Sequence, residues 1–465
     1  MEKNILANIF TLFRNITLNN IGAQRSLNEL LADNDVETVI MRMDSHELEV
    51  DKAIQEYFPE THKVMFRENK FVKGDDPYVT EKLPRTRQRY INEVELFFLL
   101  GNPIIWKKDE GDDDTFTLFK NYMKEMFFDS KIRQLKRCAG AETEAAFVYH
   151  FHRDMDGNLR VDPYVASRTK GHKIRTLFDQ YGVMQVGAVG YNININGHIR
   201  NCWDIMTPET NYQCIRGTVG WTVYPSPNPT GKINMIYVHQ PKAWDGSEPR
   251  INREEHLDSR TADTNNYFAD PMAAATADVI NAMPQRDKPG KLIQLAGANS
   301  RFQYINPPTN SEMRVSEKKD LEDSILFDTF TPDMSSQTMR SMATLTSVGI
   351  KRALVLGYIK RANRMEIYGE MVERWKNLTM AVLKALHPDM ASKLEALKIS
   401  FEFAEPFNDD KTDKWGKIGV AYQQGVISLE TAVALLGLTD APEEEVAKIR
   451  QAAAERAAMM QKTKE

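Results

Sequence analysis

Residues 331–386 decide the fold, beginning Thr331-Pro-Asp-Met-Ser-Ser-Gln-Thr-Met-Arg-Ser-Met-Ala-Thr-Leu-Thr346 and continuing into a long helical pattern. From Ser347 onward, apolar residues recur at mostly three- or four-residue steps, which is the spacing of one helix face. They are Ile350, Leu354, Tyr358, Met365, Met371, Trp375, Leu378, Val382 and Leu386. No proline interrupts the pattern before Pro388. The stretch predicts a short loop and then one helix of about 40 residues, roughly 60 Å long, which would brace several parts of a larger object.

The composition is typical of a globular protein, with 465 residues, 42% of them apolar and 27% charged. This length suggests about three domains. No apolar run approaches the roughly 18 residues that a membrane span requires. The N-terminal Met-Glu-Lys-Asn-Ile-Leu lacks the features of a signal peptide. We therefore expect a protein that is made and used in the cytosol and has no membrane partner.

The cysteines argue against a disulfide-stabilised or cysteine-metal protein, and the net charge argues against a protein that binds nucleic acid over a broad surface. Cys138, Cys202 and Cys214 show no metal-ligand spacing and leave an odd thiol under any pairing, so reduced thiols are expected. The net charge of −5 argues against a protein that grips nucleic acid over a broad surface, because such binding needs clustered Lys and Arg. A mildly acidic chain can still surround DNA without holding it tightly.

The first half of the chain combines helices with an antiparallel sheet. Residues 85–100 predict a helix for which Gly101 offers a left-handed stop, and residues 114–127 predict a second helix. Residues 139–240 are expected to be mainly antiparallel sheet, because short alternating runs are separated by turn residues. The expected strands cover 146–152, 181–189, 198–206, 212–215, 221–224 and 232–239.

The second half is mainly helical. Residues 252–270 predict a helix that is polar nearly all round, and such a helix is expected to lie between larger bodies or against copies of itself. Residues 317–327 predict another helix and 398–403 a strand. The tail should form a small helical unit with helices over 415–424, 429–436 (capped by Ser428) and 441–460.

One constellation could hold a metal, namely His150-x-His152-x-Asp154-x-Asp156. Two histidines on one strand face can bind a metal together with a carboxylate. The acids lie in a hairpin turn, however, so a half-exposed strand and its turn explain the pattern more simply. The alternative, a metal-dependent nucleic-acid-processing enzyme that uses His150, His152 and Asp154, stays open.

No other pattern assembles catalytic chemistry. The chain has no phosphate-binding Gly-x-x-x-x-Gly-Lys-Ser/Thr loop and no pairing of a nucleophile with a base. We therefore predict no catalytic residue, no cofactor and no metal site. A basic stripe on the long helix is interpreted as a solvated face or as contacts to acidic neighbours, with a DNA-facing stripe as the alternative. It comprises Lys351, Arg352, Lys360, Arg361 and Arg364.

Several segments occur in a recognisable order along nearly the whole chain. They are Leu99-Leu-Gly-Asn-Pro-Ile104, Ser259-Arg-Thr-Ala-Asp-Thr-Asn-Asn-Tyr267, Phe330-Thr-Pro-Asp-Met-Ser335, Thr346-Ser-Val-Gly-Ile-Lys-Arg352, Arg374-Trp-Lys-Asn-Leu378, Gly425-Val-Ile-Ser-Leu-Glu-Thr431 and the acidic 443–445. In this order they resemble the portal proteins of tailed bacteriophages, of the long-tailed type. In one departure, this sequence has Thr346-Ser-Val-Gly-Ile-Lys351 where the family commonly has Ser-Gly-x-Ala before the first Leu-Lys of the helix. Gly349 in the first turn favours a looser helix start.

The resemblance implies an α+β portal fold with an α+β wing, a helical stem, a small clip, a long spine helix and a helical C-terminal crown. The implied boundaries are wing 1–250 and 347–408, stem helices 251–271 and 317–330, clip 272–316, channel loop 331–346 and crown 409–465. A polar helix then makes sense as a stem that packs against its neighbours in a ring.

The resemblance also implies a function. About twelve copies would form a closed ring at one capsid vertex, which makes the chain a structural protein of the virion that assembles in the host cytoplasm. The ring would pass double-stranded DNA during packaging and ejection. It would dock terminase, major capsid or scaffolding protein, and the head-completion adaptor.

Two sets of residues are expected to carry this function. Those facing DNA in the channel loop would be Ser335, Ser336, Gln337, Thr338, Met339 and Arg340. Those contacting terminase or adaptor from the clip would be Arg286, Lys288, Lys291 and Arg301.

Overall fold

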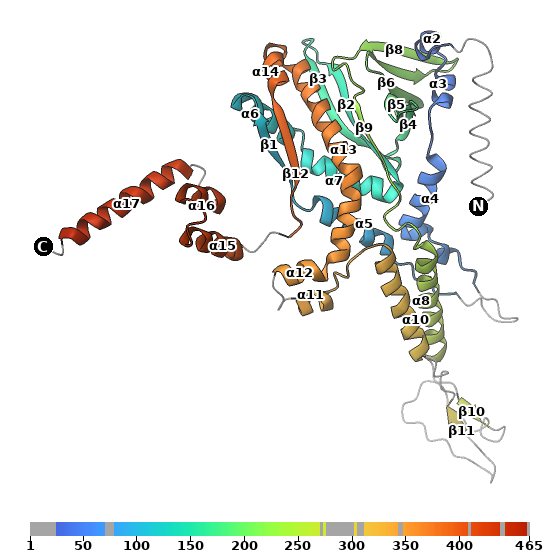
Figure 1. Ribbon diagram of the computed structural model, residues 1–465. Coiled ribbons are helices and arrows are strands. Elements are labelled where there is room, and N and C mark those ends of the chain that lie inside the picture. The colour runs from blue at the N-terminus through green and yellow to red at the C-terminus, as the bar shows by residue number, and fades with distance from the viewer. Residues whose placement is uncertain are drawn as a thin grey trace. The chain divides into compact units, whose positions relative to one another are not determined.

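The computed structural model describes residues 25–69, 79–269, 273–275, 302–304, 311–342, 347–407, 411–437 and 442–462. The chain divides into two compact units, which Figure 1 shows as ribbons. The first unit comprises Met1–Pro332 and Leu356–Phe403, and the second comprises Asp333–Val355 and Ala404–Glu465. Helices and antiparallel strands both contribute, which confirms the expected α+β class.

Helix α13 (Val355–Leu386) runs through the largest hydrophobic core of the first unit. Trp375 is fully buried on it, one turn after the buried Met371. The indole packs against the rings of Phe128 and Phe147, with centroid distances of 4.8 and 4.1 Å. The apolar face predicted for this part of the helix is therefore confirmed.

The single long helix predicted from Ser347 is wrong at one point. The chain forms α12 (Ser347–Ala353) and then α13, with Leu354 in a turn between them. Gly349 lies inside α12. The Leu354 N–H still donates to the Ile350 carbonyl at 3.0 Å, so helical spacing of the apolar residues continues through the interruption. Periodicity alone could not locate this turn.

Three helices pack beside α13 in the first unit, namely α5 (Arg87–Leu100), α6 (Asp113–Glu125) and α7 (Phe128–Glu142). The sequence predicted the first two but not α7. Gly101 follows α5 with φ −58° and ψ −40°, so the expected left-handed stop is wrong.

Helices α5 and α13 approach each other closely at Gly357. A Cβ on this residue would lie 2.4 Å from the Phe98 ring, so only glycine fits without a shift. The Phe98 ring also meets Tyr358 edge to face at 5.6 Å. The glycine therefore sets the spacing between the two helices.

The region 139–240 forms two antiparallel sheets, as the sequence predicted in outline. One sheet has the order β3-β2-β9, and the other has the order β4-β5-β6-β7-β8. The strands are β2 (Glu144–Arg153), β3 (Leu159–Ala166), β4 (Lys173–Phe178), β5 (Met184–Ile195), β6 (His198–Met206), β7 (Thr210–Arg216), β8 (Trp221–Pro227) and β9 (Met235–His239). Strand β4 was not predicted.

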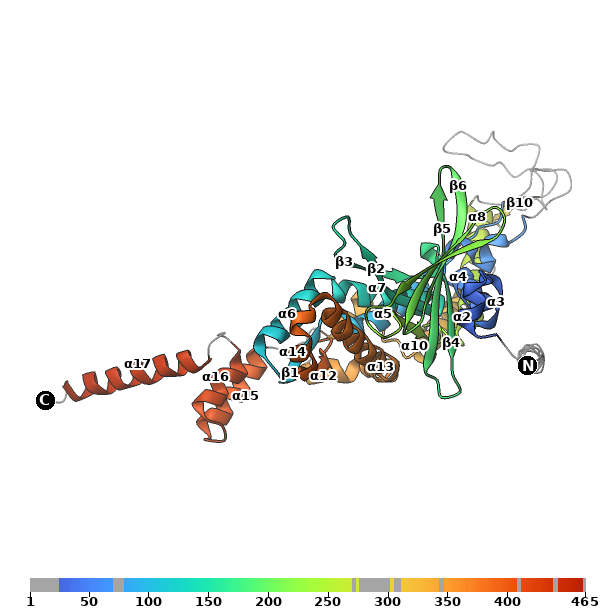
Figure 2. The ribbon, with the colours of Figure 1, turned by 90° about the horizontal axis from the view of Figure 1, so that it is seen from above.

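The five-stranded sheet is covered on both faces. Helices α2 (Leu27–Ala32) and α3 (Val36–Arg42) pack on one face, where they bury Ala188 and Ile205 (Figure 2). Val189 belongs instead to a core shared with the three-stranded sheet. Because neighbouring residues of a strand point to opposite faces, this second core lies on the other side.

The remaining elements of the first unit are short or lie at its edges. Strand β1 (Ile104–Glu110) pairs antiparallel with β12 (Lys398–Phe403), whose bounds match the prediction. Helices α8 (Glu248–Ala269) and α10 (Ser311–Asp328) both begin earlier than predicted. The others are α4 (Glu47–Tyr57), α14 (Ala391–Ala396), the short strands β10 (Ala273–Ala275) and β11 (Phe302–Tyr304), and the 3₁₀ turns Pro59–Thr61, Lys63–Phe66, Arg168–Lys170 and Pro388–Met390.

The second unit is helical in its described residues. It contains α11 (Ser336–Met342), α12, α15 (Lys411–Gln423), α16 (Leu429–Leu436) and α17 (Pro442–Lys462). The hydroxyl of Ser428 accepts from the Thr431 N–H at 3.2 Å and caps α16 as predicted. The stretch 331–346, predicted as a loop, contains helix α11 instead.

Two further observations concern the chemical class of the chain. Cys138, Cys202 and Cys214 are free thiols, as expected. Among the helices in the described residues, none combines the length and apolarity needed to span a bilayer.

Candidate channel segment and its anchor

Residues 331–346, the predicted channel segment, follow directly on a defined helix end. After α10, Phe330 adopts a left-handed conformation with φ 48°. Its N–H donates to the Phe327 carbonyl at 3.0 Å, and the Thr331 N–H donates to the Leu326 carbonyl at 2.8 Å. This pair of bonds forms a Schellman cap. The helix end therefore fixes the direction in which the chain leaves α10.

The first two residues of the segment are held in the first unit. Thr331 and Pro332 are both buried. The Tyr90 hydroxyl donates to the Pro332 carbonyl at 3.0 Å. The Lys360 ammonium donates to the Thr331 hydroxyl at 3.3 Å and to the Ala243 carbonyl at 3.3 Å. These bonds attach the start of the segment to α5 and α13.

Lys360 belongs to a buried cluster around Glu95 of α5. The Glu95 carboxylate is 2.6 Å from the Lys136 ammonium and 3.4 Å from that of Lys360. The Arg364 guanidinium approaches it at 2.9 Å. Burial alone would raise the pKa of Glu95, but the three cations outweigh it and lower the pKa to about 2. We call these four residues the Glu95 cluster.

The Glu95 cluster holds more basic than acidic groups. Burial lowers the pKa of Lys360 to about 8, although the charge of Glu95 opposes this shift. Burial likewise lowers the pKa of Lys136, which also donates to the Asn92 side chain at 3.1 Å. One carboxylate thus holds three cations, two of which are weaker bases than ordinary lysines.

The basic stripe predicted on the long helix turns inward over its second half. Lys360 and Arg364 contact Glu95, and the next residue, Arg361, donates to the Phe403 carbonyl at 2.9 Å. For these three residues the DNA-facing alternative is wrong, because their charged ends are engaged inside the first unit. Contact with an acidic neighbour, the other alternative, is confirmed for Lys360 and Arg364.

Helix α11 presents most of the residues that were expected to face DNA. The hydroxyl of Ser335 accepts from the Thr338 N–H at 3.3 Å and so caps the helix start. The carboxylate of Asp333 accepts from the N–H and the hydroxyl of Ser335, at 2.8 and 2.9 Å. Thr338 is half-buried, and the exposed members of the set are Ser335, Ser336, Gln337, Met339 and Arg340.

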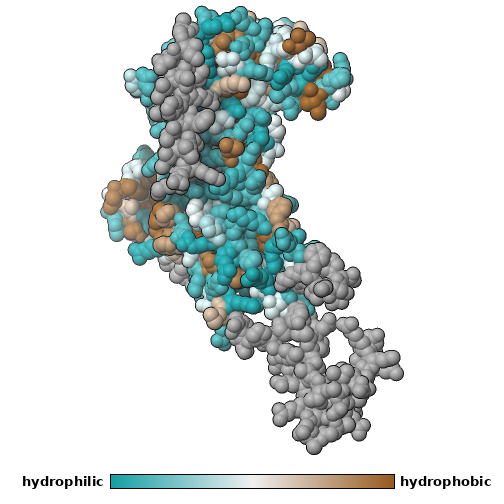
Figure 3. Space-filling model, turned by 90° about the vertical axis from the view of Figure 1, so that its right-hand side faces the viewer, coloured by the Kyte–Doolittle hydropathy of each residue, from teal (hydrophilic) through white to brown (hydrophobic). Residues whose placement is uncertain are grey.

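Helix α8, the predicted stem helix, buries a polar face inside its own chain. The buried members of this face are Glu254, Glu255, Ser259 and Asp263. Described residues between 62 and 87 cover them: Arg87 pairs with Glu254 at 2.8 Å, and Arg67 with Asp263 at 2.8 Å. The sequence predicts that this polar helix lies between larger bodies or against copies of itself, and much of its polarity is satisfied within one chain. Seen from the side that carries α4 and α8, the described surface is mainly hydrophilic (Figure 3).

His62 makes the most buried contact to α8. Its Nδ1 lies 2.6 Å from Glu255, and both side chains are at most 2% exposed. Burial alone would lower the pKa of His62, but the hydrogen bond and charge of Glu255 raise it above its usual value. The pair therefore favours a charged histidine against the buried carboxylate.

The structure does not bring His150, His152 and Asp154 together as a metal site. The two imidazoles stack at 6.1 Å on β2, and their nearest acids are different residues, Asp204 at 3.9 Å and Asp162 at 3.4 Å. The Asp154 carboxylate instead accepts from two backbone N–H groups of its hairpin turn, at 3.1 and 2.9 Å. The turn explanation fits this geometry better than the metal alternative.

The four predicted clip residues lie outside the described residues. They are Arg286, Lys288, Lys291 and Arg301. Their contacts therefore stay a prediction.

One family model covers most of the residues that the structure describes. A family model described as "Phage portal protein, SPP1 Gp6-like" matches residues 42–459. The chain belongs to this phage portal protein family. The match includes both predicted stem helices, the predicted channel segment and most of the C-terminal helices, so the resemblance proposed from the sequence is confirmed at the level of the family.

Comparisons with curated sequences and with solved structures give either no match or similarity at low sequence identity. No curated protein sequence matches this portal family member. Similar solved structures include the neck of an empty GTA particle computed with C6 symmetry, at 10% identity and TM-score 0.42, covering 76% of this chain and 90% of that chain. A chain from the virion of the native gene transfer agent particle has 10% identity and TM-score 0.44, with coverages of 86% and 98%. A chain from the neck of the native GTA particle computed with C12 symmetry has 9% identity and TM-score 0.38, with coverages of 76% and 91%. The family assignment rests on the family model alone.

Sequence reasoning missed the residues that anchor the predicted channel segment in this portal family member. Glu95 is four residues after Ile91 and three before Phe98, so it lies on the buried face of α5. An acid on an otherwise apolar face was the available signal. Its partners Lys136 and Lys360 are distant in the sequence, and no local pattern connects them.

Proposed function

We propose that about twelve copies of this chain form a closed ring at one vertex of a phage capsid and act as the conduit for double-stranded DNA. The chain would assemble in the host cytoplasm and remain in the virion. The observation that carries this proposal is the portal family match over residues 42–459. The proposed action is passage and gating of DNA, with no catalytic step.

In the proposed ring, α11 lines the DNA path. The exposed side chains of Ser336, Gln337 and Met339 are uncharged, and Arg340 adds one cation per chain. A lining of this kind lets a polyanion slide, because phosphate contacts strong enough to hold DNA would also stall it. The Glu95 cluster supports this role, since it fixes the buried base from which the exposed helix begins.

The partners proposed for the ring follow from the family. Terminase would drive DNA through it, major capsid or scaffolding protein would surround it, and a head-completion adaptor would bind after packaging. Arg286, Lys288, Lys291 and Arg301 are proposed to contact terminase or adaptor through their positive charge. If reversing these charges leaves packaging intact, the proposed clip contacts are removed.

Electron microscopy of the purified protein, with mass photometry beside it, tests the ring. We expect closed rings with a central hole and about twelve subunits. A compact monomer in every buffer and at every concentration would contradict the proposal. Bound metal that is lost in His150→Ala would instead favour the enzyme alternative at His150 and His152.

The channel role is tested by reversing the charge of Arg340. We expect Arg340→Glu to assemble normal rings but to reduce the amount of DNA packaged, because each chain then presents a carboxylate to the phosphates. Lys448→Glu is the matched control, since Lys448 is an exposed cation on α17 and the net charge change is the same. Equal packaging by the two variants would contradict a DNA-facing Arg340.

A further inference from the structure

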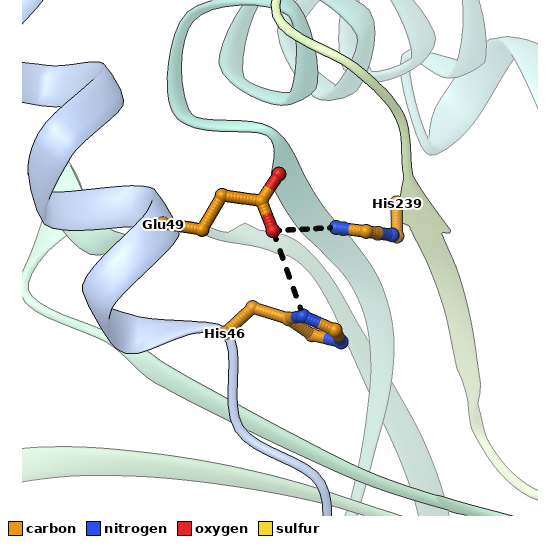
Figure 4. Close-up of side chains that lie close together, drawn as sticks. All are labelled: His46, Glu49 and His239. Atoms are coloured by element: carbon orange, nitrogen blue, oxygen red, sulfur yellow. Dashed lines mark hydrogen bonds and ion pairs between the residues drawn. The ribbon is translucent and has the colours of Figure 1, made fainter. Parts of the chain in front are cut away.

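Two histidines and a glutamate from distant parts of the chain meet at the surface of the first unit. His46 directly precedes α4, Glu49 lies in the first turn of that helix, and His239 is the last residue of β9. Figure 4 shows the Glu49 carboxylate directed at one nitrogen of each imidazole. None of these residues belongs to the metal pattern that the sequence suggested.

The three side chains have distances close to those of a metal site. The Glu49 Oε2 atom is 3.4 Å from His239 Nε2 and 3.8 Å from His46 Nδ1. One ligand atom from each residue lies within 4.8 Å of the other two, and among the described residues this is the only such group of three. Zinc bonds of about 2.0–2.2 Å in a tetrahedron place neighbouring ligand atoms roughly 3.3–3.6 Å apart. The 3.4 Å distance lies in this range and the 3.8 Å distance slightly exceeds it, so binding requires the imidazoles to rotate until both ring planes point toward the ion.

The backbones that carry these ligands are fixed before any ion binds. The Asp44 N–H donates to the Thr176 carbonyl at 2.8 Å, which joins the chain ahead of His46 to β4. His239 pairs with Glu144 in the antiparallel sheet, and the Gln240 N–H donates to the Thr143 carbonyl at 2.8 Å. Preorganised supports of this kind are what precise metal sites require.

The surroundings also suit a cation. The imidazoles stack at 4.2 Å with their planes 21° apart, and one nitrogen of each ring lies near the same Glu49 oxygen. All three side chains are between 33% and 49% exposed, which leaves a route for an ion from solvent. The Tyr237 hydroxyl on β9 donates to the Glu144 carboxylate on β2 at 2.9 Å. This bond stiffens the two strands near His239.

We propose that His46, Glu49 and His239 form a zinc site that joins α4 to β9. Two imidazole nitrogens and one carboxylate oxygen are ligands that Zn²⁺ accepts, with a fourth position left for water or another group. The ion would clamp the N-terminal helices to the strand that leads into α8. The inference is independent of the proposed ring function, because it concerns the stability of the single chain.

The test is Zn²⁺ binding to the full chain, stripped with a chelator and dialysed. Calorimetric titration should give one Zn²⁺ per chain, and the ion should raise the temperature of thermal unfolding. Co²⁺ in place of Zn²⁺ should give the visible absorption of a four-coordinate nitrogen and oxygen site. Absence of saturable binding would overturn the proposal.

Variants separate this site from nonspecific binding to surface histidines. His46→Ala, His239→Ala and the conservative Glu49→Gln should each weaken Zn²⁺ binding at least about tenfold. His198→Ala removes an exposed histidine on β6, and His150→Ala removes one of the other stacked pair, so both should leave the affinity unchanged. If Glu49→Gln folds and binds Zn²⁺ as the parent does, or if His150→Ala abolishes binding instead, the assignment is wrong.

Discussion

At the scale of single residues, a buried carboxylate organises the start of the predicted channel segment. Glu95 is fully buried and contacts Lys136, Lys360 and Arg364. Removing one partner of a buried charge cluster is far more costly than forming the cluster is favourable, because the remaining charges stay without compensation. The cluster is therefore a sensitive point of the fold.

We expect Glu95→Gln to lower the free energy of unfolding by about 3–5 kcal/mol, because it leaves two buried lysines and the half-buried Arg364 without their counterion. Urea unfolding followed by circular dichroism measures this. Glu93→Gln is the matched control two residues away on α5, where an exposed carboxylate pairs with Arg137 at 2.6 Å. The control should change stability by about 1 kcal/mol or less. Similar losses in both variants would contradict the role given to Glu95.

The lowered pKa of Lys360 predicts a pH dependence at the alkaline end. The folded-state pKa is about 8, below the ordinary value of lysine. Between about pH 8 and pH 10.4 the unfolded chain binds more protons at this residue, so stability should rise with pH, in total by on the order of 2 kcal/mol. Lys360→Met should lose this rise in chemical unfolding measured across the range. Parallel pH curves for the parent and the variant would contradict the prediction.

At the scale of elements, patterns that repeat locally were predicted well. Strands 198–206 and 398–403 and helix 429–436 have the predicted bounds, because alternation, helical spacing and the Ser428 cap are all written in adjacent residues. Helix α7 was missed because its sequence mixes charged and apolar residues, and its buried Lys136 is explained only by Glu95 on another helix.

The same contrast between adjacent and distant residues explains which parts of the candidate site could be predicted from the sequence. Residues 335–340 were predicted to face DNA from local polarity and from the family resemblance, and that role stays a prediction. The anchor was not, because the contacts of Thr331 and Pro332 come from Lys360 and Tyr90, which neighbour them only in the fold. The helix within 331–346 was also missed, since the Asp333 and Ser335 cap was interpreted as part of a loop.

Glycines on α13 provide a matched pair of substitutions. Gly357→Ala should destabilise the protein by about 1–3 kcal/mol, because its Cβ would meet the Phe98 ring at 2.4 Å. Gly369→Ala should stabilise it by about 0.5–1 kcal/mol through helix propensity, since a Cβ there meets no described atom within 4 Å. Thermal unfolding of both variants measures the contrast. A neutral Gly357→Ala would show that α5 and α13 can separate without cost.

At the scale of the whole molecule, the charge distribution fits the proposed passage of DNA without tight binding. The net charge is −5, and three of the cations in the predicted basic stripe are engaged internally. We expect the purified protein to bind free duplex DNA only weakly, with a dissociation constant of about 10 μM or more at physiological salt. Fluorescence anisotropy over a salt series measures this. Tight binding with a steep salt dependence would indicate a phosphate-gripping surface.

The chain leaves the first unit after Pro332 and again after Phe403, and one turn of α13 contacts the chain near both of these exits. Lys360 holds Thr331 near the exit at Pro332, and the adjacent Arg361 holds the carbonyl of Phe403, the last residue before the other exit. Tension applied to the chain at either exit would therefore reach the same two consecutive residues. From there it would spread along a helix whose far half is embedded around Trp375, so the first unit would resist pulling at both exits as one mechanical element.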